Sequence, residues 1–259
     1  MARLARLALP LVLALPLAGC FDVLADLSDL DDCSVEEPRR ASLDAAGATR
    51  LEIVAGAGSL EVVGTEGAGA VEVRGTACAP DAERLAGIEL RTERRGDTLH
   101  VETVFADDVR GNRRLSLEIA APASLAVSID DGSGATRVRG VASLAIEDGS
   151  GEIDVREIAG DVEVRDGSGT TTVRGVGGDV RVEDGSGGIE IADVRGDVRI
   201  DEDGSGPIDV RGVGGSVTVG DDGSGGIVAR DVRGDFTLEH DGSGNVEVDA
   251  DGRVTLPRN

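Results

Sequence analysis

The chain has 259 residues, enough for one or two ordinary domains. Its formal net charge is −24 and its basic residues are all arginine, which disfavours a role in binding nucleic acid or another polyanion. The aromatic residues are three phenylalanines, so we expect a core of Val, Ile, Leu and Ala. Such a core favours a narrow, regular fold over a globular enzyme, because large aromatics usually supply much of an enzyme's buried area.

Residues 1–19 have the layout of an export signal. Arg3 and Arg6 make a positively charged start, and residues 7–17 are apolar apart from two prolines. This run is too short to cross a bilayer as a helix. The following residues, Leu-Ala-Gly-Cys at 17–20, are similar to the lipobox of bacterial lipoproteins. The resemblance implies cleavage after residue 19 and lipid attachment, with palmitate among the acyl chains, at Cys20. The alternative is an ordinary signal peptide cleaved after small residues.

Residues 20–41 are predicted to form an acidic tether between the lipid and the folded body. Seven carboxylates lie between residues 22 and 37, and the segment ends near Pro38. Phe21, not aspartate, follows Cys20. By resemblance to lipoproteins of Gram-negative bacteria, this implies a lipid-anchored protein of the outer membrane that faces the periplasm or the cell surface.

Two cysteines remain once Cys20 carries lipid. In an oxidising envelope, two such thiols are often paired. We expect a disulfide between Cys33 and Cys78 that ties the tether to the body. The alternative is a pair of free, small residues.

Residues 42–130 contain short alternating apolar segments separated by glycine turns, which predicts strands. These segments are residues 51–54, 59–63, 70–74, 99–104 and 115–119. Residues 80–87 are predicted to be a short helical insertion. Because terminal repeats are usually atypical, this region is expected to hold the cap and the early coils of one repetitive body.

The tetrapeptide Asp-Gly-Ser-Gly occurs seven times at spacings of 17, 18, 18, 19, 19 and 19 residues. Seven copies at nearly constant spacing indicate a repeat architecture. The aspartates that begin the copies are Asp131, Asp148, Asp166, Asp184, Asp203, Asp222 and Asp241.

Each repeat contains two short runs in which aliphatic residues alternate with polar ones, the pattern of half-buried strands. In the unit that begins at Asp184, the residues expected to face inward are Ile189, Ile191, Val194, Val198 and Ile200. Glu190 and Arg199 are expected to face solvent. Glycine-rich segments between the runs are predicted to be turns.

The repeats predict an all-β fold: a single-stranded parallel β-solenoid (β-helix) of 17–19-residue coils with an irregular β N-terminal part. The solenoid spans residues 42–256, with the regular coils at 131–256, and stacked coils lie about 4.8 Å apart. One coil cannot offset its own ordering entropy, so stacking is required. A β-sandwich of hairpins is the alternative, but it would not need the same turn tetrapeptide in every unit.

The strand-rich segment 51–74, the segment Leu-Ser-Leu-Glu-Ile-Ala-Ala-Pro at 115–122 and the repeated Gly-Asp-Val-x-Val-x-Asp-Gly-Ser-Gly units resemble the DUF4097 family of adhesin-like proteins. The resemblance covers about residues 42–256. It implies a β-solenoid and carries no catalytic motif, and the adhesin label of that family is an analogy.

The seven tetrapeptide aspartates are predicted to form a row at one wet corner of the solenoid with a structural role, capping turn amides together with the serine hydroxyls. Counter-charge is expected from a nearby column that comprises Arg139, Arg156, Arg174, Arg211 and Arg230. A Ca²⁺ site is the alternative reading of such a row. We expect weak, nonspecific cation binding, no metal site and no cofactor.

Two motifs invite other interpretations. The tetrapeptide resembles the surroundings of a protease serine, but seven equivalent serines cannot share His100 and His240 as bases. No catalytic residue is therefore predicted. Arg-Gly-Asp at 95–97, 195–197 and 233–235 matches an integrin-binding tripeptide, yet two copies follow from the repeat consensus.

The sequence thus predicts an envelope-anchored, non-enzymatic solenoid that is a structural or adhesin-like interaction surface for an envelope protein or glycan. One alternative is an accessory protein of envelope-stress signalling that acts through partner contacts. Another is a β-helix enzyme that acts on polysaccharide, which is disfavoured because the chain lacks the Trp and Tyr platforms that bind sugars.

Overall fold

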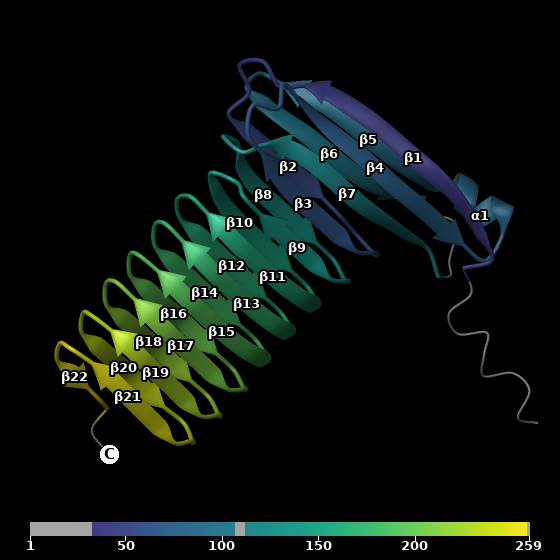
Figure 1. The fold of residues 1–259 in the computed structure, drawn as a ribbon. Coiled ribbons are helices and arrows are strands. Elements are labelled where there is room, and N and C mark those ends of the chain that lie inside the picture. The colour runs from purple at the N-terminus through teal and green to yellow at the C-terminus, as the bar shows by residue number, and fades with distance from the viewer. Residues whose placement is uncertain (1–32, 107–111, 258–259) are drawn as a thin grey trace, which may run out of the picture. The chain divides into compact units, whose positions relative to one another are not determined.

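The computed structural model describes residues 33–106 and 112–257. The described chain forms a parallel β-solenoid, which confirms the predicted fold class (Figure 1). Two 11-stranded sheets, called sheet A and sheet B, make its two faces. None of the helices within these residues is long and apolar enough to cross a membrane.

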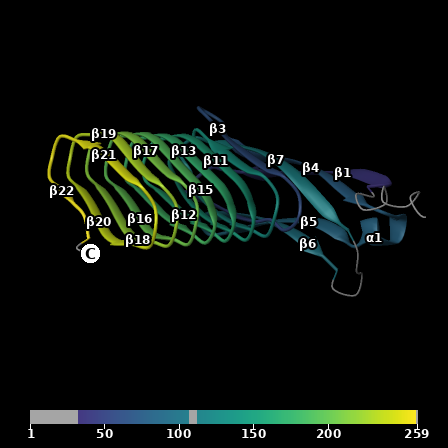
Figure 2. The same cartoon turned by 90° about the horizontal axis from the view of Figure 1, so that it is seen from below.

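Each regular coil adds one strand to each sheet, and equivalent strands pair in parallel (Figure 2). Sheet B receives β8 (Ala126–Asp131), β10 (Ser143–Asp148), β12 (Val162–Asp166), β14 (Val180–Asp184), β16 (Val198–Asp203), β18 (Val217–Asp222), β20 (Phe236–Asp241) and β22 (Val254–Thr255). Sheet A receives β9 (Thr136–Arg139), β11 (Gly151–Ile158), β13 (Gly169–Val176), β15 (Gly187–Val194), β17 (Ile208–Val213), β19 (Ile227–Val232) and β21 (Val246–Ala250).

The last glycine of the tetrapeptide is required by both conformation and space. Gly206 has a φ of +144°, a backbone conformation that other residues rarely adopt. A Cβ atom at Gly206 would lie 1.4 Å from the carbonyl oxygen of Gly187 in the preceding coil. The stacking of coils therefore explains why this glycine recurs along the chain.

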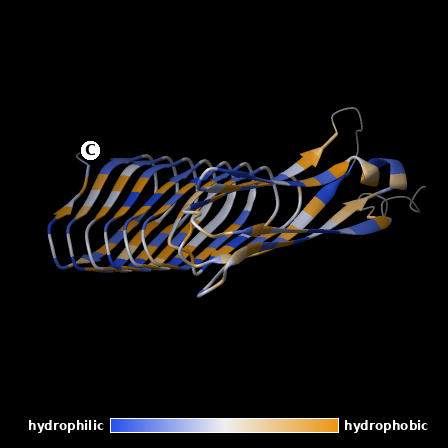
Figure 3. Cartoon of the chain, turned by 90° about the horizontal axis from the view of Figure 1, so that it is seen from above, coloured by the Kyte–Doolittle hydropathy of each residue, from blue (hydrophilic) through white to orange (hydrophobic). Residues whose placement is uncertain are grey.

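The core runs along the solenoid axis and follows the predicted alternation (Figure 3). Val198 and Ile200 are 1% and 0% exposed, whereas Arg199 is exposed. The last coil departs from this pattern: Val254 and Leu256 are 45% and 49% exposed, because within the described residues no further coil covers them.

The N-terminal part of the described body is a cap whose spatial order differs from its chain order. Its elements are β1 (Val35–Asp44), β2 (Arg50–Val54), β3 (Leu60–Thr65), β4 (Ala70–Ala79), α1 (Ala82–Ala86), β5 (Ile88–Arg95), β6 (Thr98–Phe105) and β7 (Arg114–Pro122). Strand β2 lies between β6 and β8, and β3 lies between β7 and β9, so β2 and β3 form an inner coil. Strands β1, β4 and β5 add antiparallel pairs outside it.

Two sequence expectations meet the structure in this cap. The helix predicted within 80–87 is α1, which begins after the N-cap residue Asp81. Strand β1 begins at Val35, so the last residues of the expected 20–41 tether belong to sheet A. Pro38 is tolerated there because β1 is an edge strand. The expected signal segment at 1–19 and Cys20 lie outside the described residues.

Candidate interaction surface

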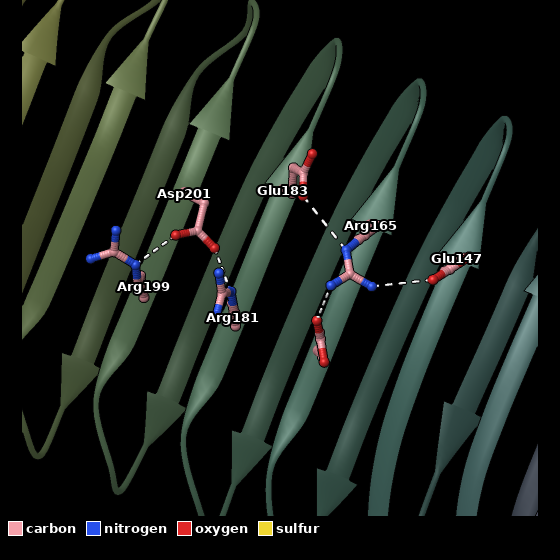
Figure 4. A network of polar contacts seen from close by, with 7 residues as sticks. Glu147, Arg165, Arg181, Glu183, Arg199 and Asp201 are labelled. Carbon is pink, nitrogen blue, oxygen red and sulfur yellow. Dashed lines mark hydrogen bonds and ion pairs between the residues drawn. The ribbon is translucent and has the colours of Figure 1, made fainter.

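The outer face of sheet B carries ion pairs that cross coils (Figure 4). Arg165 on β12 contacts Glu147 on β10 at 3.1 Å, Glu163 on its own strand at 2.5 Å and Glu183 on β14 at 3.6 Å. These side chains are between 41% and 67% exposed, so each pair adds little stability by itself. The network holds charges of both signs at defined positions on the outer face of sheet B.

A second network lies beside the first, on β14 and β16 (Figure 4). Asp201 accepts hydrogen bonds from Arg181 and from Arg199, the latter at 2.6 Å. Burial opposes ionisation of this carboxyl, but the bonds from Arg199 and Arg181 outweigh it and lower the pKa of Asp201. Asp201 therefore stays ionised and holds both guanidinium groups on the same face.

Sheet B is also hollowed near these networks. A hollow of about 700 Å³ extends from β2 across β8, β10, β12, β14 and β16. Charged side chains along it include Arg50, Glu52, Glu163, Arg181 and Arg199. The hollow is open and long, and its lining mixes charged with aliphatic side chains, so it suits an extended partner surface more than an enclosed small molecule.

The arginine column expected beside the tetrapeptide aspartates lies elsewhere, on the outer face of sheet A. Arg174 and Arg211 both bind Glu190, and Arg156 contacts Asp154 at 2.8 Å. The expected counter-charge role is therefore wrong, because these arginines pair with acids of their own sheet. Glu190 is half-buried instead of fully exposed, since the two arginines cover it.

The tetrapeptide aspartates, called the corner aspartates below, do form a row. They pair in register through sheet B from Asp131 to Asp241. The expectation of a wet, exposed row is wrong for six of the seven: they are 1% to 6% exposed, and only Asp241 is exposed. In the coils up to Asp184 the reason is strand parity, because the aspartate lies two residues after an inward aliphatic such as Val182 or Ile146. Asp203 lies three residues after Ile200, and the register shift where β14 pairs with β16 returns it to the inward face.

Part of the expected capping is present. The amide of Ser150 donates to Asp148, that of Ser168 to Asp166 and that of Ser186 to Asp184, at 3.0–3.1 Å. These bonds satisfy one carboxylate oxygen each. Within the described part of the chain, the other oxygen of Asp148 and of Asp184, one oxygen of Asp131, and both oxygens of Asp203 and Asp222 are buried without a hydrogen-bond donor.

Burial raises the pKa of every buried corner aspartate, because desolvation disfavours the charged form. The pKa rises to about 6 for Asp148 and Asp184 and to about 7 for Asp203. The neighbouring corner aspartates add to the shift through like-charge repulsion.

A second column, of four aspartates and one serine, lies at another turn of the coil, in the Gly-Asp or Gly-Ser step just before β12, β14, β16, β18 and β20. This Gly-Asp column comprises Asp161, Asp179, Asp197, Ser216 and Asp235. Each side chain accepts the backbone N–H of the equivalent residue in the next coil, at 2.7–3.1 Å. The aspartates of two Arg-Gly-Asp tripeptides, Asp197 and Asp235, belong to this column, so their carboxylates already bind the backbone.

Cys33 and Cys78 lie next to each other where β1 pairs with β4. Their Cα atoms are 5.4 Å apart, within the range that a disulfide requires, and their sulfurs are in contact. The disulfide stays a prediction, which the intact mass before and after reduction would test. Glu36 lies close to both sulfurs, and a bound metal ion in place of the bond would appear in the same mass measurement.

Sequence reasoning missed the burial of the corner aspartates, although a signal was present. Counting in steps of two from Val180 and Val182 leads to Asp184, which places it on the inward face. The adjacent Gly-Ser-Gly is typical of a solvent-exposed turn. This composition therefore assigns the aspartate to the turn and not to the inward face of the strand before it.

Neither the scan of family models nor the search of curated proteins by sequence found a match. Membership of the DUF4097 family therefore stays a prediction. Among solved structures, the chain is similar to a proposed cell adhesion protein from Clostridium sporogenes, at 12% identity and a TM-score of 0.34, over 87% of this chain and 100% of that one.

Two further structures share the likeness, each over 87% of this chain and 98% of the other. One is a proposed adhesin from Bacteroides fragilis, at 14% identity and a TM-score of 0.40. The other is a proposed lipid-binding protein from Parabacteroides distasonis, at 16% identity and a TM-score of 0.42. At these values the likeness does not extend to what any of the three proteins binds.

Proposed function

We propose that this chain is a non-catalytic interaction protein of the bacterial envelope, anchored by lipid at Cys20. The observation that carries the interaction role is the outer face of sheet B. There, Arg165 links three successive coils and Asp201 links two arginines, so charges of both signs are held at fixed positions. Such a face selects a partner by charge complementarity.

The partner that fits this face best is an envelope protein with charges of both signs. The charged side chains of successive coils on this face lie about 4.8 Å apart, which is the usual distance between neighbouring strands of a sheet. A flat, polar partner surface would therefore meet several coils at once. Ion pairs of this kind mainly set specificity and association rate.

Charge reversal on one face tests the interaction role. The variant Arg165→Glu/Arg181→Glu changes sheet B, and the matched variant Arg156→Glu/Arg211→Glu changes sheet A. We expect cross-linking in envelope extracts to show a partner protein that the sheet B variant loses and the sheet A variant keeps, with binding to the unchanged chain weakened by salt. Equal retention by both variants, or capture of glycan alone, would contradict the proposal.

The anchoring half of the proposal rests on the lipobox-like residues that precede Cys20, since a thiol there can accept a diacylglycerol. We expect Cys20→Ala to abolish palmitate labelling and to leave the chain unprocessed or free of the membrane. The control is Cys33→Ala, which keeps Cys20. A mature Cys20→Ala chain that stays in the membrane fraction after carbonate washing would contradict lipid anchoring.

A further inference from the structure

The buried corner aspartates form a row of carboxyl groups for which the surroundings supply almost no positive charge. Adjacent members are in register across strands that lie about 4.8 Å apart. The groove beside them is about 540 Å³ and is lined by Arg165 together with further acids, which are Asp130, Glu147, Glu183 and Glu202. At the C-terminal end of the row, Asp221 and His240 form an exposed pair at 3.0 Å.

The opposite wall of the core, on sheet A, offers either a hydroxyl or a methyl group to each aspartate. Thr136 donates to Asp131 at 2.7 Å, and Thr171 donates to Asp166 at 3.4 Å. In the other coils the equivalent positions on sheet A are aliphatic and carry no titratable group: Ile153, Ile189, Ile208 and Ile227. Hydroxyl support therefore reaches only the first and third members of the row.

Most of the unsatisfied oxygens belong to members without a threonine, and one oxygen of Asp131 is unsatisfied as well. One oxygen of Asp148, one of Asp184 and both of Asp203 lack a donor among the described residues. A protonated carboxyl is itself a donor, so a neutral aspartate can satisfy an ionised neighbour in the next coil. Asp203 and Asp222 are close enough for a side-chain hydrogen bond of this kind.

We propose that the corner aspartates of adjacent coils share protons, with Asp148, Asp184 and Asp203 as the protonated members, so that mild acid stabilises the solenoid. Asp131 and Asp166, supported by threonine hydroxyls, are the ionised neighbours of Asp148 and Asp184, and Asp222 is the ionised neighbour of Asp203. This inference is independent of the proposed partner and of the lipid anchor. The raised pKa values of Asp148, Asp184 and Asp203 agree with the same three positions.

The direction of the pH effect follows from these shifts. A carboxyl whose pKa is higher in the folded chain than in the unfolded chain binds more protons when folded. Its contribution is most favourable below the unfolded value near 4 and is lost as the pH rises through the folded values of about 6 to 7. We therefore expect the melting temperature to rise by several degrees when the pH is lowered from 8 to 5.

The test combines a spectroscopic and a thermal measurement on the full chain. Infrared spectra at neutral pH should contain the C=O stretching band of protonated carboxyl groups, and Asp184→Asn/Asp203→Asn should weaken it. The same double variant should melt at a higher temperature at pH 8 and show a flatter pH dependence. The control Asp179→Asn/Asp197→Asn changes two carboxyls of the Gly-Asp column and should leave the infrared band unchanged.

Three results would overturn the proposal. The first is the absence of a protonated carboxyl band at neutral pH. The second is a melting temperature that does not rise on acidification. The third is saturable binding of Ca²⁺, measured by calorimetry and lost in Asp184→Asn/Asp203→Asn, which would show that cations and not protons neutralise the row.

Discussion

The two aspartate columns of this solenoid repeat with the same period, yet they have opposite environments. Asp197 of the Gly-Asp column is exposed, and its carboxylate accepts the amide of Ser216 in the next coil at 2.7 Å. Asp203, six residues later, is 1% exposed, and neither of its oxygens has a hydrogen-bond donor in residues 33–106 and 112–257. Aspartate therefore links neighbouring coils at the Gly-Asp turn. At the other turn, it places a carboxyl group without a counter-charge in the protein interior.

The difference arises from where each aspartate lies relative to a strand. Asp197 precedes β16, so its side chain can turn toward the backbone of the neighbouring coil. Asp203 ends β16 on the inward side of the pleat, after the bulge that shifts the register near Glu202. An inward carboxyl can lower its free energy by keeping a proton, whereas an outward one is hydrated.

The largest expected effect comes from placing a carboxylate inward with no partner at all. Val198→Asp puts a charge into the aliphatic core one position after Asp197, and we expect it to cost about 3 kcal/mol or more of unfolding free energy. The adjacent Arg199→Asp, on the outer face, should be mild. Denaturant melts measure the unfolding free energy of both variants. Equal losses would mean that an inward and an outward carboxylate cost the same, so burial would not explain the difference between the two aspartate columns.

A smaller effect is expected when a corner aspartate loses its hydroxyl. Thr136→Val removes the 2.7 Å bond to Asp131 and nearly conserves shape, so we expect a loss of about 1.5–3 kcal/mol near neutral pH. The loss should shrink toward pH 4, because burial raises the pKa of Asp131 and a protonated carboxyl in the folded chain accepts a weaker hydrogen bond from Thr136.

The reciprocal change to Thr136→Val is Ile189→Thr, which offers Asp184 the hydroxyl that Thr171 gives Asp166. It should lower the pKa of Asp184 and flatten the pH dependence of the melting temperature. A loss in Thr136→Val that is the same at pH 4 and pH 7 would show that the threonine acts by packing alone.

The smallest effect belongs to the Gly-Asp column. Asp197→Ala leaves the amide of Ser216 to water, and we expect a loss of about 1 kcal/mol. Asp197→Ser should cost less, because Ser216 already accepts the amide of Asp235 at the same position of its own coil. Urea unfolding measures both, and a serine variant as unstable as the alanine variant would contradict the inter-coil bond.

By itself, the sequence determined the solenoid, the two-strand coil and the inward aliphatic columns. A period of 17–19 residues with alternation inside each unit allows few other packings. It also located the row of corner aspartates, because parallel stacking places equivalent residues side by side. These features depend on spacing alone.

Only the tertiary structure decided which carboxylates are buried and which charged side chains form ion pairs. The sheet A arginines bind Glu190 and Asp154 because those acids share their face, although the corner aspartates recur with the same period. The order of the cap strands, with β2 and β3 inside β6 and β7, depends on long-range pairing that no local pattern encodes. Whether an aspartate at a turn faces water or the core depends on the last residue of a strand, where a turn-like composition and strand parity make opposite predictions.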